Sequence, residues 1–302
     1  MTNKRGDLFP QFDFTGNWRL WFAVSGIIIL IGLLSLFTRG LNVGIDFTGG
    51  SAVDLKFAER VTVAEVRDAL ADFGHGAAEI LSSPEDPDLI ILRTQTFSDE
   101  QEKEAIYEAL RTRVGEFEEL QSQHVMPVVS QELARNAMLA MLIAAAGILV
   151  YVSFRFEWRF GVAAILALVH DALVTLGLFS IFQLAVDMPF VAAILTIMGY
   201  SINASIVVFD RIRENLKYRK KERLGELANA SISQTLMRCI NTSATTLLVV
   251  LAVLLFGGRT IQSFMLALLI GVLAGTYSSI FLASSLWLML RGETGKMRTA
   301  KA

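Results

Sequence analysis

Residues 194–215 read ILTIMGYSINASIVVFDRIREN, and the interpretation of the whole chain starts from them. The stretch begins as an apolar helix, passes small and polar residues at 199–205, and ends in a charged run at 210–214. Polar groups inside a membrane helix are costly and usually face the interior of a helix bundle. The stretch therefore predicts a membrane-spanning helix that carries a working site.

The composition of the whole chain is typical of an integral membrane protein. Of its 302 residues, 53% are hydrophobic and 19% are charged, and the mean hydropathy is +0.51. The single cysteine, Cys239, excludes an intramolecular disulfide and a cysteine-based metal cluster. The sequence has no histidine pair with metal-ligand spacing, no phosphate-binding loop and no nucleophile motif. It predicts a protein that is not an enzyme, holds no metal or cofactor, and takes energy from a gradient or a partner.

Six apolar runs approach or exceed the roughly 20 residues that are needed to cross a bilayer. They occupy residues 20–37, 137–154, 160–182, 189–209, 239–256 and 264–290. The first run has no clear small-residue cleavage site, so we expect an uncleaved span rather than a secretory signal. The sequence therefore predicts a polytopic α-helical membrane protein with six transmembrane helices.

Residues 39–135 have a different character, because they hold 19 Asp and Glu against 9 Lys and Arg and contain no spanning run. Residue patterning predicts strands at 51–57, 77–82, 89–94 and 117–126, and helices at 62–73 and 98–114. The second helix opens on a capping-box pair, Ser98 and Gln101, and residues 83–87 form a turn. The order β-α-β-β-α-β favours a ferredoxin-like α+β domain.

The distribution of Lys and Arg predicts the orientation in the membrane. With a cytoplasmic N-terminus, the cytoplasmic parts hold 17 basic residues, whereas the short outer loops hold only Arg259. We therefore expect both termini in the cytoplasm and the acidic domain in the periplasm. The expected parts are the N-terminus and first helix at 1–38, the periplasmic domain at 39–128, helices two to six at 129–290 with a basic cytoplasmic loop at 210–238, and a cytoplasmic tail at 291–302.

One charged residue, Asp171, lies inside the six runs, at the middle of the third and directly after His170. A charged side chain at the centre of a bilayer costs about 2.5–3.5 kcal/mol on insertion scales. One interpretation is a proton-relay or gating carboxylate; the other is a buried, neutral carboxyl group that hydrogen-bonds neighbouring helices. The first is favoured because acids at the membrane midplane often mark ion pathways.

Two other spans carry polar faces whose role the residues leave open. Thr196, Tyr200, Asn203 and Asp210 share one face of the fourth span. The fifth span opens with Arg238 and Thr242 on one face. Either face fits a proton pathway or interhelical hydrogen bonds, and Arg238 fits a position at the cytoplasmic surface or an inward position opposite an acid.

Two simpler patterns complete the membrane part of the chain. Small residues at 271, 275, 279 and 283 predict a seam for close helix packing in the sixth span. Seven basic residues at 211–223 indicate attraction to anionic lipid rather than to nucleic acid.

Several long motifs follow one another in a distinctive order. Asp46, Gly49 and Gly50 belong to Gly-Ile-Asp-Phe-Thr-Gly-Gly at 44–50, and His-Asp follows at 170–171. Gly199 opens the motif Gly-Tyr-Ser-Ile-Asn at 199–203, and the run 206–214 that follows contains Asp210, Arg211 and Arg213. Further motif blocks lie at 238–246 and 256–258. Over nearly its whole length, the chain resembles the SecF family of bacterial protein-export subunits, within the RND superfamily.

The resemblance implies an auxiliary subunit of the Sec preprotein translocase in the inner membrane. Such a subunit pairs with SecD and uses the proton-motive force to pull preproteins from the SecYEG channel, with YajC and YidC as further candidate partners. The candidate coupling residues are Asp171, Tyr200, Asn203, Arg238 and Thr242.

One position departs from the family pattern. That pattern has an aspartate where this chain has Ala204, so we expect normal assembly but weak coupling to the proton gradient. For Asp46, a turn that seats the outer domain on the first span is favoured over a chemical role. Two other functions stay open, one half of an RND-like proton/solute antiporter and a non-transporting scaffold of the translocon.

Overall fold

The computed structural model describes residues 13–76, 78–82, 86–95, 97, 100–218, 223–258 and 261–292. The chain separates into two compact units, one of Met1–Asn42 with Leu139–Ala302 and the other of Val43–Met138. Several predicted features lie outside the described residues. These are Ser98 of the capping box, residues 83–85 of the predicted turn, the centre of the basic loop at 219–222, Arg259, and the basic residues of both chain ends before 13 and after 292.

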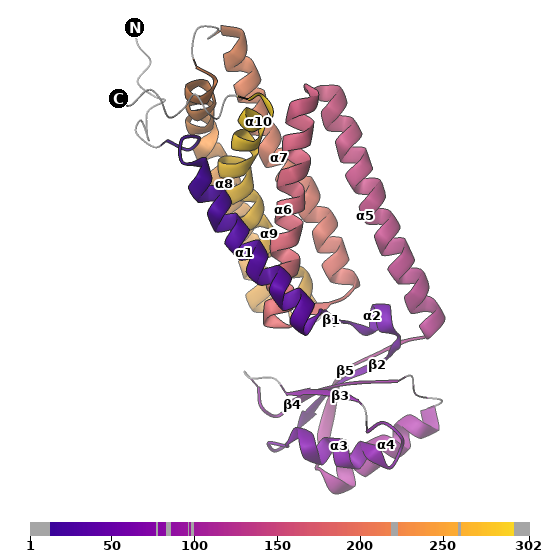
Figure 1. Ribbon diagram of the computed structural model, residues 1–302. Helices are drawn as coiled ribbons and strands as arrows, with labels where there is room; N and C mark the ends of the chain where they lie inside the picture. Colours follow the sequence, from indigo (N-terminus) through magenta and orange to yellow (C-terminus); the bar gives the residue numbers. More distant parts are fainter. Residues whose placement is uncertain are drawn as a thin grey trace. The chain divides into compact units, whose positions relative to one another are not determined.

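The first unit is built from long apolar helices, and the six predicted spans are confirmed (Figure 1). The helices are α1 (Trp18–Arg39), α5 (Pro127–Arg155), α6 (Trp158–Phe182), α7 (Met188–Tyr218), α8 (Leu224–Phe256), and α9 (Gln262–Tyr277) continued by η2 (Ser278–Leu282) and α10 (Ala283–Leu290). Two short strands are β1 (Asn42–Val43) and β6 (Ala185–Val186).

Residues 210–238, expected to form a loop, are mostly helical. Helix α7 continues to Tyr218, and α8 already begins at Leu224. The hydropathy pattern ends where the chain becomes polar, but a helix satisfies its own backbone hydrogen bonds and can continue beyond that point. The loop between the two helices is therefore much shorter than the sequence suggests.

Helices α1 and α6 meet at two glycines that the sequence pattern does not single out. A Cβ atom added to Gly32 would lie 2.8 Å from the Cα atom of Gly177. One turn along α1, the hydroxyl oxygens of Ser35 and Ser180 are 3.0 Å apart, and Ser180 donates a 2.7 Å hydrogen bond to the Gly40 carbonyl. Small residues and hydroxyl groups thus hold α1 against α6, as expected for helices in lipid.

We expect Gly177→Leu to lower the thermal unfolding midpoint of the purified protein by several degrees. A side chain at this position would overlap the backbone of Gly32, and such overpacking typically costs about 1–3 kcal/mol. Gly26→Leu is the matched control, because a Cβ atom added to Gly26 on α1 meets no atom within 4 Å. Equal midpoints for both variants in detergent micelles would contradict the close contact.

The first half of the predicted small-residue seam, Gly271 and Gly275, lies between α9 and α7. A Cβ atom on Gly271 would overlap the side chain of Ile197, and one on Gly275 would lie 3.0 Å from the Cβ atom of Ser201. Directly after this contact, the sixth span changes to the π-helical turn η2. The sequence does not predict this turn, because residues 278–282 contain no glycine or proline that would mark a change in the helix.

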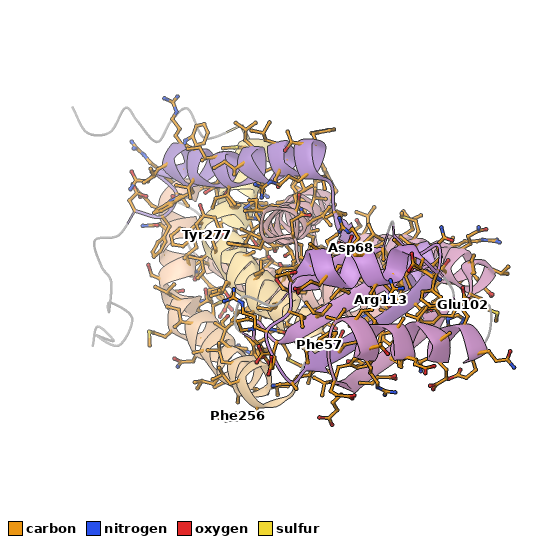
Figure 2. The ribbon with its side chains drawn as sticks, turned by 90° about the horizontal axis from the view of Figure 1, so that it is seen from below. Phe57, Asp68, Glu102, Arg113, Phe256 and Tyr277 are labelled. Atoms are coloured by element: carbon orange, nitrogen blue, oxygen red, sulfur yellow. The ribbon has the colours of Figure 1, made fainter. Side chains whose placement is uncertain are left out.

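The second unit is a four-stranded sheet with two helices on one face (Figures 1 and 2). Its elements are α2 (Ile45–Thr48), β2 (Gly50–Phe57), α3 (Val63–Ala71), β3 (Glu79–Ser82), β4 (Leu89–Thr94), α4 (Glu100–Arg113) and β5 (Phe117–Val125). The strands lie in the order β3-β4-β2-β5, and each neighbouring pair is antiparallel. This element and strand order is that of the predicted ferredoxin-like split βαβ fold.

Apolar side chains from the sheet and the two helices form the core of this unit. Val53 and Leu55 of β2 are completely buried, as are Ile106 and Leu110 of α4. The alternation along β2 therefore places its apolar side chains under the helices.

Helix α3 begins at a complete capping box. Its N-cap, Thr62, accepts a 3.3 Å hydrogen bond from the Glu65 backbone N–H, and the Glu65 carboxylate accepts one of 2.8 Å from the Thr62 N–H. This reciprocal pair satisfies two backbone donors that the first turn of a helix leaves without partners. The start of α3 is thus encoded locally.

Candidate functional site

Asp171 lies in α6 at the centre of a buried cluster, and only 1% of its surface is exposed. Its Oδ2 accepts hydrogen bonds from Ser201 Oγ on α7 at 2.5 Å and from Ser278 Oγ at 2.9 Å. Its Oδ1 lies 2.9 Å from His170 Nδ1. The carboxyl group therefore joins three membrane helices, and these hydrogen bonds offset part of the cost of its burial.

Ser278 reaches Asp171 from the first residue of the π turn η2. Such a turn adds one residue to a helical turn and re-aims the side chains around it, and π turns are frequent at functional sites. Gly275 also lies at this cluster: a Cβ atom there would be in ordinary van der Waals contact with Asp171 Oδ2, at 3.5 Å, but in a tight 3.0 Å contact with the Cβ atom of Ser201. The sequence indicates Asp171 but not Ser278; the serine-rich run at 278–285 is the only signal that would have indicated it.

His170 extends the cluster toward α1. Its ring stacks on Tyr277, with centroids 6.1 Å apart, and Tyr277 lies among the membrane helices (Figure 2). The Tyr277 hydroxyl donates a 2.9 Å hydrogen bond to the Trp21 carbonyl and accepts one of 3.4 Å from Ser25. A run of contacting polar groups therefore extends from Asp171 through the bundle to α1.

Tyr200 belongs to a second cluster. Its hydroxyl donates a 3.2 Å hydrogen bond to Ser243 Oγ on α8, and Thr276 Oγ1 on α9 donates one of 2.6 Å to the same oxygen. Because Tyr200 and Ser201 are neighbours on α7, the two clusters start from adjacent residues of one helix. Thus α7 contacts α6 and η2 through Ser201, and α8 and α9 through Tyr200.

Other predicted site residues are exposed along α7 and α8. We call the exposed side chains of Thr196 and Asn203 on α7, with Arg238, Asn241 and Thr242 on α8, the polar stripe. Ala204 is partly buried beside it. Polar side chains within membrane helices normally face protein or water rather than lipid. The stripe therefore has the character of a surface that another protein covers.

Arg238 does not serve as the counter-charge of Asp171. Within the described residues, the hydrogen-bond partners of the Asp171 carboxyl group are Ser201, Ser278 and His170. Arg238 is exposed on α8 instead. The structure thus divides the predicted pathway residues among the buried cluster around Asp171, the second cluster with Tyr200, and the polar stripe.

The membrane helices differ strongly in burial. The most apolar windows of α1, α5 and α8 are 11%, 11% and 17% buried, whereas those of α6, α7 and the sixth span are 50%, 44% and 50% buried. An inner set of three helices is therefore flanked by three that expose most of their surface to lipid or to a partner.

The glycine-rich turn at 44–50 lies in the α+β unit. Gly49 and Gly50 have φ of +73° and +123°, and a Cβ atom on Gly50 would overlap the Thr94 carbonyl oxygen at the end of β4. Positive φ and this close approach both require glycine. The two glycines thus form the tight connection between α2, which carries Asp46, and the start of β2 beside β4.

Comparisons with known proteins decide the family. Residues 105–293 match the model described as "Protein export membrane protein SecD/SecF, C-terminal", and residues 34–59 match the "SecD/SecF GG Motif". The chain belongs to the SecD/SecF family. A protein translocase subunit SecF from Sebaldella termitidis is 44% identical, over 90% of this chain and 89% of the relative. The SecF subunit of Pseudomonas aeruginosa is 41% identical, over 93% and 92%.

A solved structure of this SecD/SecF family supports the fold. The crystal structure of SecDF from Thermus thermophilus, a translocon-associated membrane protein, matches with a TM-score of 0.87 and 38% identity. The match covers 96% of this chain and 40% of that protein, so the chain spans less than half of its length. The predicted six-helix, RND-type membrane fold is confirmed by this likeness.

In this SecD/SecF chain, the charged family motif at the end of α7 connects helices. Asp210 forms a 3.6 Å ion pair with Arg155 of α5, and Arg213 donates a 3.4 Å hydrogen bond to the Arg155 carbonyl. Arg211 contacts Gln234 of α8 at 2.5 Å and Glu214 at 2.6 Å. These contacts give Asp210, Arg211 and Arg213 a structural role at one end of the bundle.

A buried polar contact strengthens the same end of the SecD/SecF helix bundle. Asn215 of α7 is 7% exposed and donates hydrogen bonds to Ser231 at 2.8 Å and to Gln234 at 3.0 Å on α8. The sequence does not single out these three residues, because they occur in an ordinary polar segment. They connect the last turns of α7 to the first turns of α8.

Proposed function

We propose that this chain is the SecF subunit of a bacterial preprotein translocase, coupling inward proton flow to late-stage protein export without itself being an enzyme. The observation that carries the proposal is the polar stripe. In an isolated six-helix chain, the part of the stripe within the bilayer would face lipid, and exposure of polar side chains to lipid costs free energy. A partner helix bundle removes that cost, and the relatives named SecDF support SecD as that partner.

Membrane orientation is part of the proposal. The distribution of basic residues supports a cytoplasmic N-terminus and C-terminus in the inner membrane, with the α+β unit in the periplasm. In that position, the α+β unit meets polypeptides that leave the SecYEG channel. Because the chain spans only 40% of SecDF, the proposed activity belongs to the complex with SecD, SecYEG and their preproteins, and to YajC and YidC where they join it.

The coupling step follows from the geometry of Asp171. The ionised carboxylate accepts hydrogen bonds from α7 and from η2 at the same oxygen. When the proton is on Oδ2, this oxygen itself becomes a donor, so at least one of its contacts with Ser201 and Ser278 must rearrange. Protonation of this oxygen would therefore change how α7 sits against the sixth span. Because Tyr200 and the α7 residues of the polar stripe, Thr196 and Asn203, lie on this helix, the change would reach the surface that faces SecD.

A stalled-translocation assay tests the proposal. Vesicles containing this chain, SecD and SecYEG receive SecA, ATP and a preprotein; the ATP is then removed and completion of transport is followed. We expect a proton gradient to speed completion several-fold and a protonophore to abolish the effect. Arg238→Leu should remove most of the gain, because the charge that faces SecD is lost.

Lys217→Leu is the matched control, since it also removes an exposed basic side chain, at the end of α7 outside the polar stripe. It should leave the gradient effect unchanged. Completion that never depends on the gradient would instead support a scaffold, and gradient-driven movement of a small solute without preprotein would support an antiporter half.

A further inference from the structure

The α+β unit contains a cleft that none of the steps above uses. Its cavity volume is about 280 Å³. One wall is the glycine-rich turn, with Ile45 and Thr48 of α2, and the opposite wall contains His75, Glu79 and Thr94. These residues surround the start of β3 and the end of β4. The family's glycine motif therefore forms one side of a binding-sized cavity.

The charged groups of this cleft are already paired. Arg93 and Glu79 form a 3.5 Å ion pair. His75 is 7% exposed; its Nδ1 lies 2.5 Å from Thr94 Oγ1, and its Nε2 lies 3.3 Å from Glu102 Oε1. Ile45 and Ala78 add apolar surface. A site with paired charges and mixed walls suits an uncharged group that can both pack and hydrogen-bond.

The lining of the cleft includes Glu79, the first residue of the edge strand β3. Strand β3 is the outermost strand at this side, so one row of its backbone N–H and C=O groups has no neighbouring strand within the described residues. Such an edge can accept an extended peptide as an additional strand. A strand added beside β3 would carry alternate side chains past the mouth of the cleft.

The opposite edge, β5, is much less suited to pairing. The register between β2 and β5 shifts between Asp54 and Leu55, which leaves Leu120 as an extra, bulged residue. Acidic side chains, Glu118 and Glu119, lie next to this bulge. Bulges and charges are common means by which proteins keep a sheet edge from pairing. The described part of the domain therefore offers one favourable edge, that of β3.

We propose that an extended segment of the exported polypeptide adds to β3 as a fifth strand and places an uncharged side chain in the cleft. The identity of this ligand rests on the proposed export function. Backbone hydrogen bonds supply affinity that is independent of sequence, which suits a protein that handles many different preproteins. In this arrangement, Gly49 and Gly50 keep the α2 wall close enough to Thr94 to shape the cavity.

Binding of a labelled probe peptide to the purified full-length chain in nanodiscs tests the proposal. The probe is a neutral 12-residue peptide of Ser, Thr and Val, followed by fluorescence anisotropy. Thr48→Trp should fill the cleft and weaken binding about tenfold or more, equivalent to about 1.4 kcal/mol. Gln123→Trp on β5 is the matched control, because both positions are exposed and tolerate a large side chain. It should bind the probe as the unmodified chain does.

A second probe tests the strand pairing itself. Proline at alternate positions removes the backbone donors on one edge of the peptide, so this probe should not bind. Equal binding of both probes, or equal binding by the Thr48→Trp and Gln123→Trp variants, would overturn the proposal. If either of these binding results is found but export still depends on the proton gradient, the proposed function remains and only the strand-addition proposal is rejected. If the probe binds as expected but the proton gradient has no effect on export, the coupling function is rejected and the proposal of peptide binding at the cleft remains.

Discussion

Asp171→Leu should strongly destabilise the membrane unit and abolish gradient-dependent export. The substitution removes the common acceptor of Ser201 and Ser278 and the partner of His170 Nδ1. Ser201 and His170 would each lose a buried partner, at about 1–3 kcal/mol per group, whereas Ser278 would keep its 3.3 Å hydrogen bond to the Gly275 carbonyl. This is the most damaging single change that we predict. A large fall in the thermal unfolding midpoint of the purified protein would show it.

Asp171→Asn separates the structural role of this residue from its role in coupling. Asparagine has nearly the same shape, and its amide oxygen can accept from both Ser201 and Ser278 in place of Oδ2. The unfolding midpoint should therefore stay much closer to that of the unmodified chain than with leucine. Asparagine cannot exchange a proton, so gradient-dependent completion of export should nevertheless be lost. Unchanged export in Asp171→Asn would show that the carboxyl group only holds α6, α7 and η2 together.

Ala204→Asp should raise gradient-dependent export several-fold above that of the unmodified chain. Ala204 is partly buried on α7, directly after the exposed Asn203 and beside the polar stripe. An aspartate here would place a proton-accepting group on the surface proposed to face SecD, where Arg238 provides opposite charge. The same vesicle assay measures the effect, with the rate in the presence of a protonophore subtracted.

Ala204→Asn is the matched control for this gain, since its side chain has the size of aspartate but cannot take up a proton. It should leave export at the level of the unmodified chain. Co-purification with SecD must be equal for all variants, so that assembly is not the variable. An equal gain with asparagine, or no gain with aspartate in an assembled complex, would reject a coupling role for this position.

The sequence by itself determined the number of spans and the class of each unit. A helix must satisfy its backbone within lipid, so an apolar run near 20 residues is a strong and purely local signal. The fold of the α+β unit could also be predicted from the sequence. Residue alternation, turn residues and element order restrict the ways in which four strands and two helices can pack. The capping box shows that four residues, Thr62 to Glu65, are enough to specify where a helix begins.

The tertiary structure alone decided which residues act together. Ser201 and Ser278 lie 30 and 107 positions from Asp171, yet both donate to the same oxygen. The cluster depends on the contact of Gly275 with α7 and on the π turn. The residue pattern places Gly275 in a packing seam but does not tell which helix it meets, and it does not predict the π turn. Likewise, Arg238 does not meet Asp171 because of the way in which α8 is rotated about its own axis in the bundle. Periodicity indicates which residues share a face of one helix, but only packing between helices determines what that face meets.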